Sequence, residues 1–167
     1  DVLHGMQNFR IVVQPVVSAP SGTVIGGEVL LRWSFQGKDI SPAVFIPILE
    51  QENMIHLVGR WVFEQAVCTC VRIHAYNPTF YLTFNVSLHQ LADEYLLRFM
   101  QQTLEKYHLD GANLVAELTE SCLDEEPEQL QLFVNECQKM GISIALDDFG
   151  SGYSSLNVMG ALKIDEL

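Results

Sequence analysis

Residues 142–156 read I-S-I-A-L-D-D-F-G-S-G-Y-S-S-L and carry the clearest structural signal in the chain. A mostly apolar run, residues 142–146, has the character of a buried strand and ends in two adjacent carboxylates, Asp147 and Asp148. Neighbouring carboxylates repel each other unless a metal ion, a basic side chain, a helix N-terminus or water lies beside them. Two glycines follow and allow the chain to turn tightly there. The stretch therefore predicts a buried strand whose polar end lies beside a positive group or water.

The segments upstream alternate between strand-like and helix-like patterns. We expect strands at residues 9–17, 23–33, 81–86, 113–119 and 142–147. The first two are separated by a short turn, residues 18–22, which predicts a hairpin. We expect helices at residues 42–51 after a Ser41 N-cap, at 56–76, at 93–107, from an Asp124 N-cap to a stop at Gly141, and from about Ser154 onward.

From the third strand onward the order is β-α-β-α-β-α, which predicts parallel strands covered by helices. A closed (β/α)₈ barrel and an open doubly wound sheet both fit this order. A barrel takes about 250 residues, and the 167 residues here supply five or six strands. The run M-G-A-L-K-I-D-E-L reaches Leu167 with no signal that closes the element. A barrel interpretation therefore places the C-terminal part of the fold beyond this sequence.

The composition is that of one globular domain. Apolar residues make up 49% of the chain and charged residues 18%, with a net charge of -12. Such an acidic chain disfavours DNA, RNA or anionic membranes as partners, although a small phosphorylated ligand can bind where divalent cations offset the charge. No apolar run reaches the roughly 18 residues that span a bilayer, and the first residues, D-V-L-H-G-M, do not have the pattern expected of a signal peptide. The four cysteines form no C-x-x-C pair, which favours reduced thiols and a cytoplasmic location.

A set of polar residues lies in or just after the apolar strand runs: Glu28, Asn85, Glu117, Asp147 and Asp148. Three of these strand-end positions, Asn85, Glu117 and Asp147, recur after 32 and then 30 residues, one βα unit each time. Successive parallel strands place their C-terminal ends on one face, so these side chains would converge. Oxygen ligands of this kind suit Mg²⁺ or Mn²⁺, and an aspartate that bridges two ions is usual in two-metal sites. The alternative is that each residue caps a helix or a turn.

Six motifs occur in order along the chain: Q-P-V-V at residues 14–17, G-G-E-V-L-L-R-W at 26–33, F-I-P at 45–47, N-V-S at 85–87, E-L-T-E-S at 117–121 and D-D-F-G-S-G-Y-S-S-L at 147–156. In this the chain resembles the EAL-domain family of cyclic diguanylate phosphodiesterases, whose signature triplet reads E-V-L at residues 28–30 here. The resemblance covers essentially the whole chain. It implies a TIM-type (β/α) barrel with one antiparallel strand, of which residues 1–167 would form the N-terminal two-thirds.

The resemblance also implies roles for individual residues. Glu28, Asn85, Glu117 and Asp147 would hold one Mg²⁺ or Mn²⁺, and Asp147 would bridge to a second ion beside Asp148; Glu28, Asp147 and Asp148 are the expected catalytic residues. Gln14 and Arg32 would contact cyclic diguanylate, with the forked Arg32 guanidinium on a phosphate oxygen. Glu120 would stabilise the loop formed by residues 149–155. The resemblance further implies flanking sensor or cyclase domains, a homodimer, and a cytoplasmic site that can belong to a membrane-bound parent protein.

The chain departs from the family pattern at several positions. Val29 replaces the alanine of the signature triplet, and Ser151 replaces a common threonine but keeps its hydroxyl. The family has a catalytic lysine in a K-x-D element, followed by a further glutamate and a glutamine. Lys163 comes five residues early for that lysine, so we interpret it as a turn residue. Two functions follow: hydrolysis of cyclic diguanylate to the linear dinucleotide, or an inactive module that senses the nucleotide or binds a protein partner.

Overall fold

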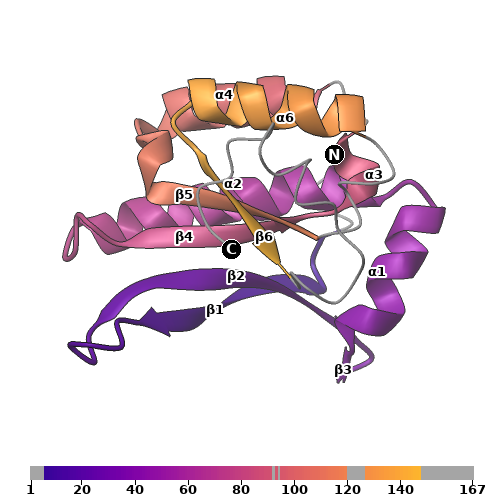
Figure 1. The fold of residues 1–167 in the computed structure, drawn as a ribbon. Helices are drawn as coiled ribbons and strands as arrows, with labels where there is room; N and C mark the ends of the chain where they lie inside the picture. The colour runs from indigo at the N-terminus through magenta and orange to yellow at the C-terminus, as the bar shows by residue number, and fades with distance from the viewer. Residues whose placement is uncertain (1–5, 92, 94, 120–126, 148–167) are drawn as a thin grey trace.

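The computed structural model describes residues 6–91, 93, 95–119 and 127–147, and within them the strands form one mixed sheet with the order β1-β2-β4-β5-β6 (Figure 1). The first two strands, β1 (Phe9–Val17) and β2 (Val24–Phe35), pair antiparallel as the predicted hairpin. Their turn is closed by the Gly22 N–H, which donates to the Ser18 carbonyl at 2.8 Å. Gly22 has φ 67°, a left-handed conformation that glycine adopts without a Cβ penalty.

A short third strand was missed by the sequence analysis. β2 continues two residues past Trp33, and β3 (Lys38–Ile40) returns antiparallel beside it. The two residues between these strands, Gln36 and Gly37, have φ of 50° and 74°. Positive φ at both central positions is the geometry of a two-residue hairpin turn. The sequence signal is weak here because glutamine is rarely found in the first of these positions.

The parallel part of the sheet follows the predicted alternation. β4 (Tyr81–Val86) lies beside β2, β5 (Leu114–Thr119) beside β4, and β6 (Ser143–Asp147) beside β5, all parallel. Each pair is joined through helical segments on one side of the sheet, as expected for parallel connections. The described strands form an open sheet, and its closure into a barrel stays a prediction.

The helices agree with the predicted segments apart from their ends. They are α1 (Pro42–Gln51), α2 (Ile55–His74), the short α3 (Leu88–Leu91), α4 (Leu96–Tyr107), the 3₁₀ turn η2 (Gly111–Asn113) and α6 (Pro127–Lys139). Ser41 precedes α1, but its side chain makes no capping hydrogen bond. The helix α3 was missed, and α4 begins at Leu96 rather than at Asp93. The Asp124 cap and the helix expected from Ser154 lie outside the described residues.

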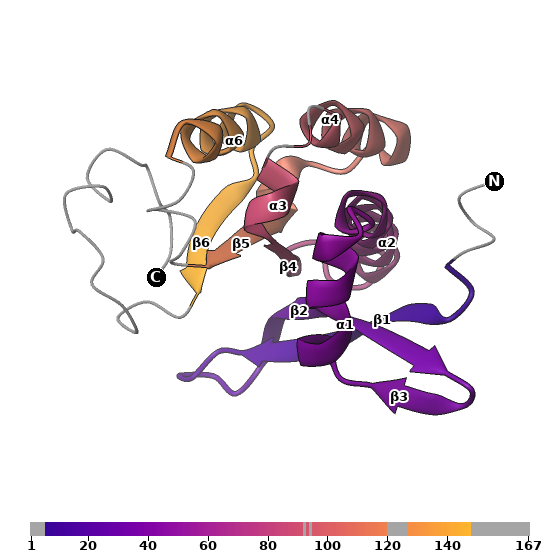
Figure 2. The same cartoon turned by 90° about the vertical axis from the view of Figure 1, so that its right-hand side faces the viewer.

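Helices α2, α4 and α6 pack on the same face of the sheet, as both views show (Figures 1 and 2). The strands bury alternate residues against them: Val29, Phe84, Val86, Ala116, Leu118, Ile144 and Leu146 are each 4% exposed or less. The ring of Phe63 on α2 meets that of Phe84 on β4 edge to face, with centroids 5.2 Å apart. No helix among the described residues is long and apolar enough to cross a membrane.

Candidate functional site

Glu28 lies in the middle of β2, directly after two glycines whose lack of a side chain is structurally required. A Cβ on Gly26 would lie 2.7 Å from the Tyr81 ring, and a Cβ on Gly27 would lie 2.4 Å from Cγ1 of Val13. The glycine pair therefore lets side chains of β1 and β4 lie close to the β2 backbone at this point. Glu28 itself is half-buried on the opposite face from the helices.

The strand register brings Glu28, Asn85 and Glu117 to one face of the sheet. Glu28 is paired with Thr83 of β4, and Asn85 lies two residues further along the same strand. Asn85 is in turn paired with Glu117 of β5. Because side chains alternate along a strand with a period of two, all of these residues point away from the helix-covered face. The predicted convergence of these three residues is confirmed for their backbone placement.

The fourth predicted ligand is placed at the end of the next strand. Glu117 is paired with Ala145 of β6, and Asp147 is the last residue of that strand, two positions further on. The backbone of β6 therefore ends with Asp147 at the same end of the sheet as Glu117. The side chain of Asp147, together with Asp148 and Glu120, lies outside what the structure describes.

A hydrogen bond joins the first two predicted ligands directly. Nδ2 of Asn85 donates to Oε1 of Glu28 at 3.0 Å, across two neighbouring strands. A carboxylate can only accept, so the amide nitrogen faces Glu28 and the Asn85 carbonyl oxygen points elsewhere. That oxygen is a ligand atom of the type that Mg²⁺ and Mn²⁺ prefer. The contact therefore fixes which end of the Asn85 amide faces Glu28.

The donor set fits a hard divalent cation in its chemistry. Glu28 and Glu117 supply carboxylate oxygens and Asn85 an amide oxygen. Within the described ranges, no three His, Cys, Asp or Glu residues come together as a complete metal site. The paired aspartates that would add to the set, Asp147 and Asp148, are those whose side chains are not described.

The two predicted substrate residues flank Glu28 on the same face. Gln14 of β1 is paired with Glu28 and is exposed. Arg32 lies four residues beyond Glu28 in β2, which is the same side of the strand, and is half-buried. Its Nη1 donates to the Leu31 carbonyl at 2.9 Å, so the guanidinium folds back along its own strand. The remaining donors of the guanidinium fork are directed away from that carbonyl.

A largely apolar pocket of about 590 Å³ opens beside this set. Glu28, Arg32 and Asn85 line it together with residues of α1, α2 and the turn after β4, among them Ile46, Glu50, Ile55, Val58, Gly59, Val62, Ser87, His89 and Gln90. Glu50 of α1 and His89 of α3 lie 3.5 Å apart at the pocket. A cavity with apolar walls and a few polar groups at one end is typical of a small-molecule site.

Several pocket residues were given no individual role by the sequence analysis, among them Gly59, Ser87 and Gln90. The signals were present, because S-x-x-Q directly after a strand is a helix-start pattern and a glycine inside a helix often marks a close approach. The Ser87 hydroxyl is buried and has no hydrogen-bond partner among the described residues. It lies next to the pocket rather than in the core.

The end of the hairpin opposite its turn is held by an ion pair. The Arg10 guanidinium donates to both carboxylate oxygens of Asp39, at 3.1 and 2.7 Å, and Ser34 Oγ donates to the same carboxylate at 2.6 Å. The hydrogen bond from Arg10, followed by that from Ser34, lowers the pKa of Asp39 to about 2. These contacts tie β3 to β1 through β2 and belong to the scaffold.

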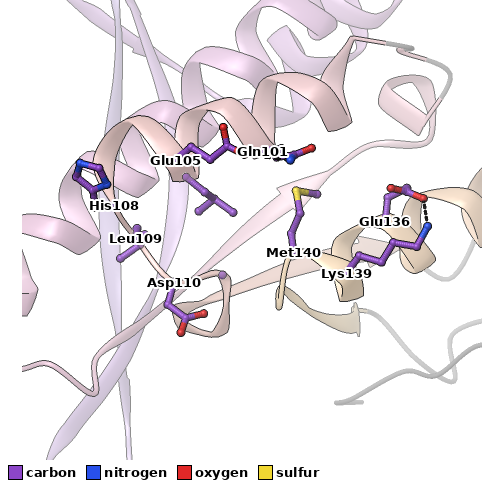
Figure 3. A pocket seen from close by; sticks show the side chains of 10 residues that line it. Gln101, Glu105, His108, Leu109, Asp110, Glu136, Lys139 and Met140 are labelled. Carbon is purple, nitrogen blue, oxygen red and sulfur yellow. Dashed lines mark hydrogen bonds and ion pairs between the residues drawn. The ribbon is translucent and has the colours of Figure 1, made fainter.

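A second hollow, of about 570 Å³, lies between the C-terminal halves of α4 and α6 (Figure 3). The residues that line it include Gln101, Glu105, His108, Asp110, Glu136, Lys139 and Met140. Its lining segments directly precede β5 and β6 in the chain, so the hollow lies at the N-terminal ends of these strands. Asn85 and Asp147 lie at the opposite, C-terminal ends of their strands. The lysine of the hollow is already paired with Glu136 at 2.6 Å, and we assign the hollow no chemistry.

Three of the four cysteines are described and are free thiols: Cys68, Cys70 and Cys137. Burial raises the pKa of the Cys70 thiol to about 11, and burial raises that of Cys137 further. Thiols of this kind are unreactive and pack as small apolar groups. The expectation of reduced cysteines is confirmed for these three, and Cys122 lies outside the described residues.

Comparison with known proteins gives consistent relatives. The EAL domain family matches residues 3–167. The bifunctional diguanylate cyclase/cyclic di-GMP phosphodiesterase MucR of Pseudomonas aeruginosa is 32% identical over 172 residues, covering 100% of this chain and 25% of MucR. The cyclic di-GMP phosphodiesterase PA2567 of the same organism is 31% identical over 159 residues, covering 95% of this chain and 27% of the relative. The chain thus spans about a quarter of the length of these relatives.

Solved structures of EAL proteins share the fold. The solved MucR phosphodiesterase in complex with c-di-GMP superposes with a TM-score of 0.85 at 31% identity, over 95% of this chain and 67% of that one. The EAL enzyme Bd1971 with bound cAMP and cyclic-di-GMP superposes with a TM-score of 0.86 at 28% identity, over 98% of this chain and 46% of that one. With the mixed sheet, the antiparallel hairpin and the family match over residues 3–167, the chain belongs to the EAL domain family.

Proposed function

We propose that this chain is part of a metal-dependent phosphodiesterase that opens cyclic diguanylate to the linear dinucleotide in bacterial signalling. The observation that carries the proposal is the hydrogen bond from Asn85 to Glu28 across β2 and β4, with Glu117 in register beside them. The relatives at 31–32% identity are named phosphodiesterases of this nucleotide, which supports the reaction class.

The proposed metal ligands are Glu28, Asn85, Glu117 and Asp147 for one ion, with Asp147 and Asp148 for a second. EAL domains are generally metal-dependent. Mg²⁺ or Mn²⁺, when bound, would polarise the phosphodiester and lower the pKa of a water molecule. The sheet contributes the positions: Glu28, Asn85 and Glu117 are fixed on three adjacent strands, and Asn85 is turned by its hydrogen bond to Glu28.

The substrate would lie along the same face. Arg32 lines the pocket and can donate two hydrogen bonds to a phosphate oxygen pair, which a lysine in its place could not reproduce. Gln14, exposed beside Glu28, offers an amide to the same ligand. The apolar walls between α1 and α2 suit a planar base better than a second charged group. Glu120 keeps the role of supporting the loop that follows Asp148.

For the whole protein we propose that the open sheet continues into a closed (β/α) barrel, of which residues 1–167 form one part. The solved MucR chain, of which this chain covers 67%, supports that length. Flanking sensor or cyclase domains, a homodimer and a cytoplasmic site complete the proposal. The family lysine, glutamate and glutamine would then lie in the remainder of the barrel.

The test compares metal binding and turnover in the full-length protein and two glutamate variants. Glu28→Gln keeps the size of the side chain but removes a ligand charge, so Mn²⁺ affinity and conversion of cyclic diguanylate should both fall by at least about 100-fold. Glu105→Gln makes the same change on the exposed face of α4 and should leave both unchanged. Nucleotide binding is followed by isothermal titration, and the linear product by chromatography.

The outcomes separate the two functions. Metal-dependent binding with product that disappears in Glu28→Gln supports the phosphodiesterase. Binding of cyclic diguanylate with no product in the wild-type protein would replace the enzyme by a module that senses the nucleotide. Equal turnover in the wild type and Glu28→Gln would refute the proposed site.

A further inference from the structure

We propose that Gln90 is a positioning residue for Asn85: its buried side chain fixes the turn after β4 and thereby the direction of the Asn85 amide. The inference rests on the proposed metal site, in which Asn85 is a ligand. Asn85 is the penultimate residue of β4, and the chain turns into α3 only two residues later. Whatever holds that turn also holds Asn85.

Two reciprocal hydrogen bonds close the turn. The Ser87 N–H donates to Oε1 of Gln90 at 3.0 Å, and the Gln90 N–H donates to the Ser87 carbonyl at 2.9 Å. The first of these is the side-chain half of a capping box, in which a glutamine side chain accepts from the backbone N–H of the residue that precedes the helix. The serine hydroxyl does not complete the box, because it has no partner among the described residues. The side chain of Gln90 therefore carries this closure.

The Gln90 side chain is held in place by α2. It is 5% exposed, and a Cβ added to Gly59 would lie 1.8 Å from its Nε2 and 2.8 Å from its Cδ. Glycine inside a helix costs about 1 kcal/mol relative to alanine, so its presence here is explained by the amide that lies against it. Gly59 and Gln90 thus form one contact between α2 and the turn.

A second tie anchors the same segment one residue further along α2. Asp93, three residues after Gln90, is nearly buried, with its side chain 6% exposed, and its carboxylate is paired with Arg60. The Asp93 N–H donates to the Gln90 carbonyl at 3.0 Å. Gly59 and Arg60 are adjacent in sequence, so α2 contacts the segment after β4 at two neighbouring positions, Gln90 and Asp93.

A change at Gln90 is expected to affect the candidate metal site because few residues separate Gln90 from Asn85 in the chain. A change that frees Gln90 leaves the Ser87 N–H without its acceptor and lets the turn relax, and Asn85 is two residues away. Groups that orient a metal ligand without touching the metal typically alter affinity by about 10- to 100-fold when removed. Gln90 is therefore expected to act on metal binding, whereas a glutamine that serves only packing would act on stability alone.

The experiment is a Mn²⁺ titration of the full-length protein without nucleotide, with free Mn²⁺ followed by electron paramagnetic resonance. Gln90→Met keeps the shape but removes the acceptor and should weaken Mn²⁺ binding about 10- to 100-fold. Gln90→Glu keeps the acceptor oxygen and should bind Mn²⁺ no more than about threefold more weakly than the wild type. Gln101→Met, an exposed glutamine on α4, is the matched control and should bind as the wild type does.

Gly59→Ala gives a second route that leaves Gln90 in the chain but displaces its side chain, and it should weaken Mn²⁺ binding in the same direction. This variant decides the matter if Gln90→Met does not fold. Wild-type affinity in Gly59→Ala or in a folded Gln90→Met would overturn the positioning role while leaving the proposed function standing. Absence of Mn²⁺ binding by the wild-type protein would instead overturn the proposed metal site, and the positioning role with it.

Discussion

Replacing Gly59 with alanine tests the contact between α2 and the turn after β4 through stability alone. At an exposed position inside a helix, glycine to alanine stabilises a protein by about 1 kcal/mol. At Gly59 we expect the opposite sign, because the new methyl group would lie 1.8 Å from Nε2 of Gln90. The glutamine side chain, which is 5% exposed, must move, and this movement breaks the contact that it makes with the turn.

The expected size follows from the bonds that are lost. Displacing Gln90 removes its 3.0 Å hydrogen bond from the Ser87 N–H, and leaving such a donor without a partner away from water costs about 1–3 kcal/mol. Set against the helical gain of about 1 kcal/mol, Gly59→Ala should destabilise the protein by about 1 kcal/mol. That lowers the Tm of a domain of this size by about 2–4 °C.

A double-mutant cycle with Gln90→Ala separates the effect of the Gly59–Gln90 contact from the other effects of Gly59→Ala on stability. With the glutamine shortened, the methyl group has room, and Gly59→Ala should recover its ordinary stabilisation of about 1 kcal/mol. The coupling between the two sites is then about 2 kcal/mol, measured by urea unfolding of four proteins. A coupling below about 0.5 kcal/mol, or a stabilising Gly59→Ala in the parent background, would refute the close approach on which the argument depends.

Two further predictions concern titrating groups. The pKa of Asp39 is lowered to about 2 by Arg10, so its contribution to stability is present above the unfolded pKa of 3.8 and is lost as the pH falls through about 2. Urea unfolding should show Asp39→Asn slightly less stable than the parent at pH 7, with the difference closing between pH 4 and 2; a constant difference would contradict this. The pKa of the buried Cys70 thiol is raised to about 11, so the stability that it contributes as a neutral thiol is full below pH 9 and falls as the pH rises through 11. Iodoacetamide at pH 8 should label Cys70 and Cys137 only after unfolding, and rapid labelling of the native protein would exclude their burial.

The sequence predicted the parallel part of the fold well because each signal there is local. The strand that ends at Asp147 and the helix that ends before Gly141 are marked by apolar runs and by a residue that must adopt φ of 82°. The short strand β3 and the four-residue α3 were missed, since each is too short to show a period. Their existence depends on pairing with β2 and on the contact with α2, which composition does not reveal.

For the site, composition and spacing identified Glu28, Asn85 and Glu117, and the register then placed them together on one face. The sequence could not predict the Asn85–Glu28 hydrogen bond, because it requires knowing that β2 and β4 are neighbours. Gln90 was overlooked for a related reason. Its role depends on Gly59, 31 positions earlier in the chain, and only packing makes such a pair visible.

Residues of the candidate site and residues of the hydrophobic core alternate along the same strands. The packing of the core therefore determines which residues of these strands face the site. Phe84 packs under α2 while its neighbour Asn85 points to the opposite face. A slip of one residue in β4 would send Asn85 into the core and Phe84 into the site. The edge-to-face contact of Phe84 with Phe63 therefore selects the register that presents Asn85 to Glu28. Changes that weaken this packing but keep the register should cost stability and spare the site, whereas an insertion within β4 should abolish both together.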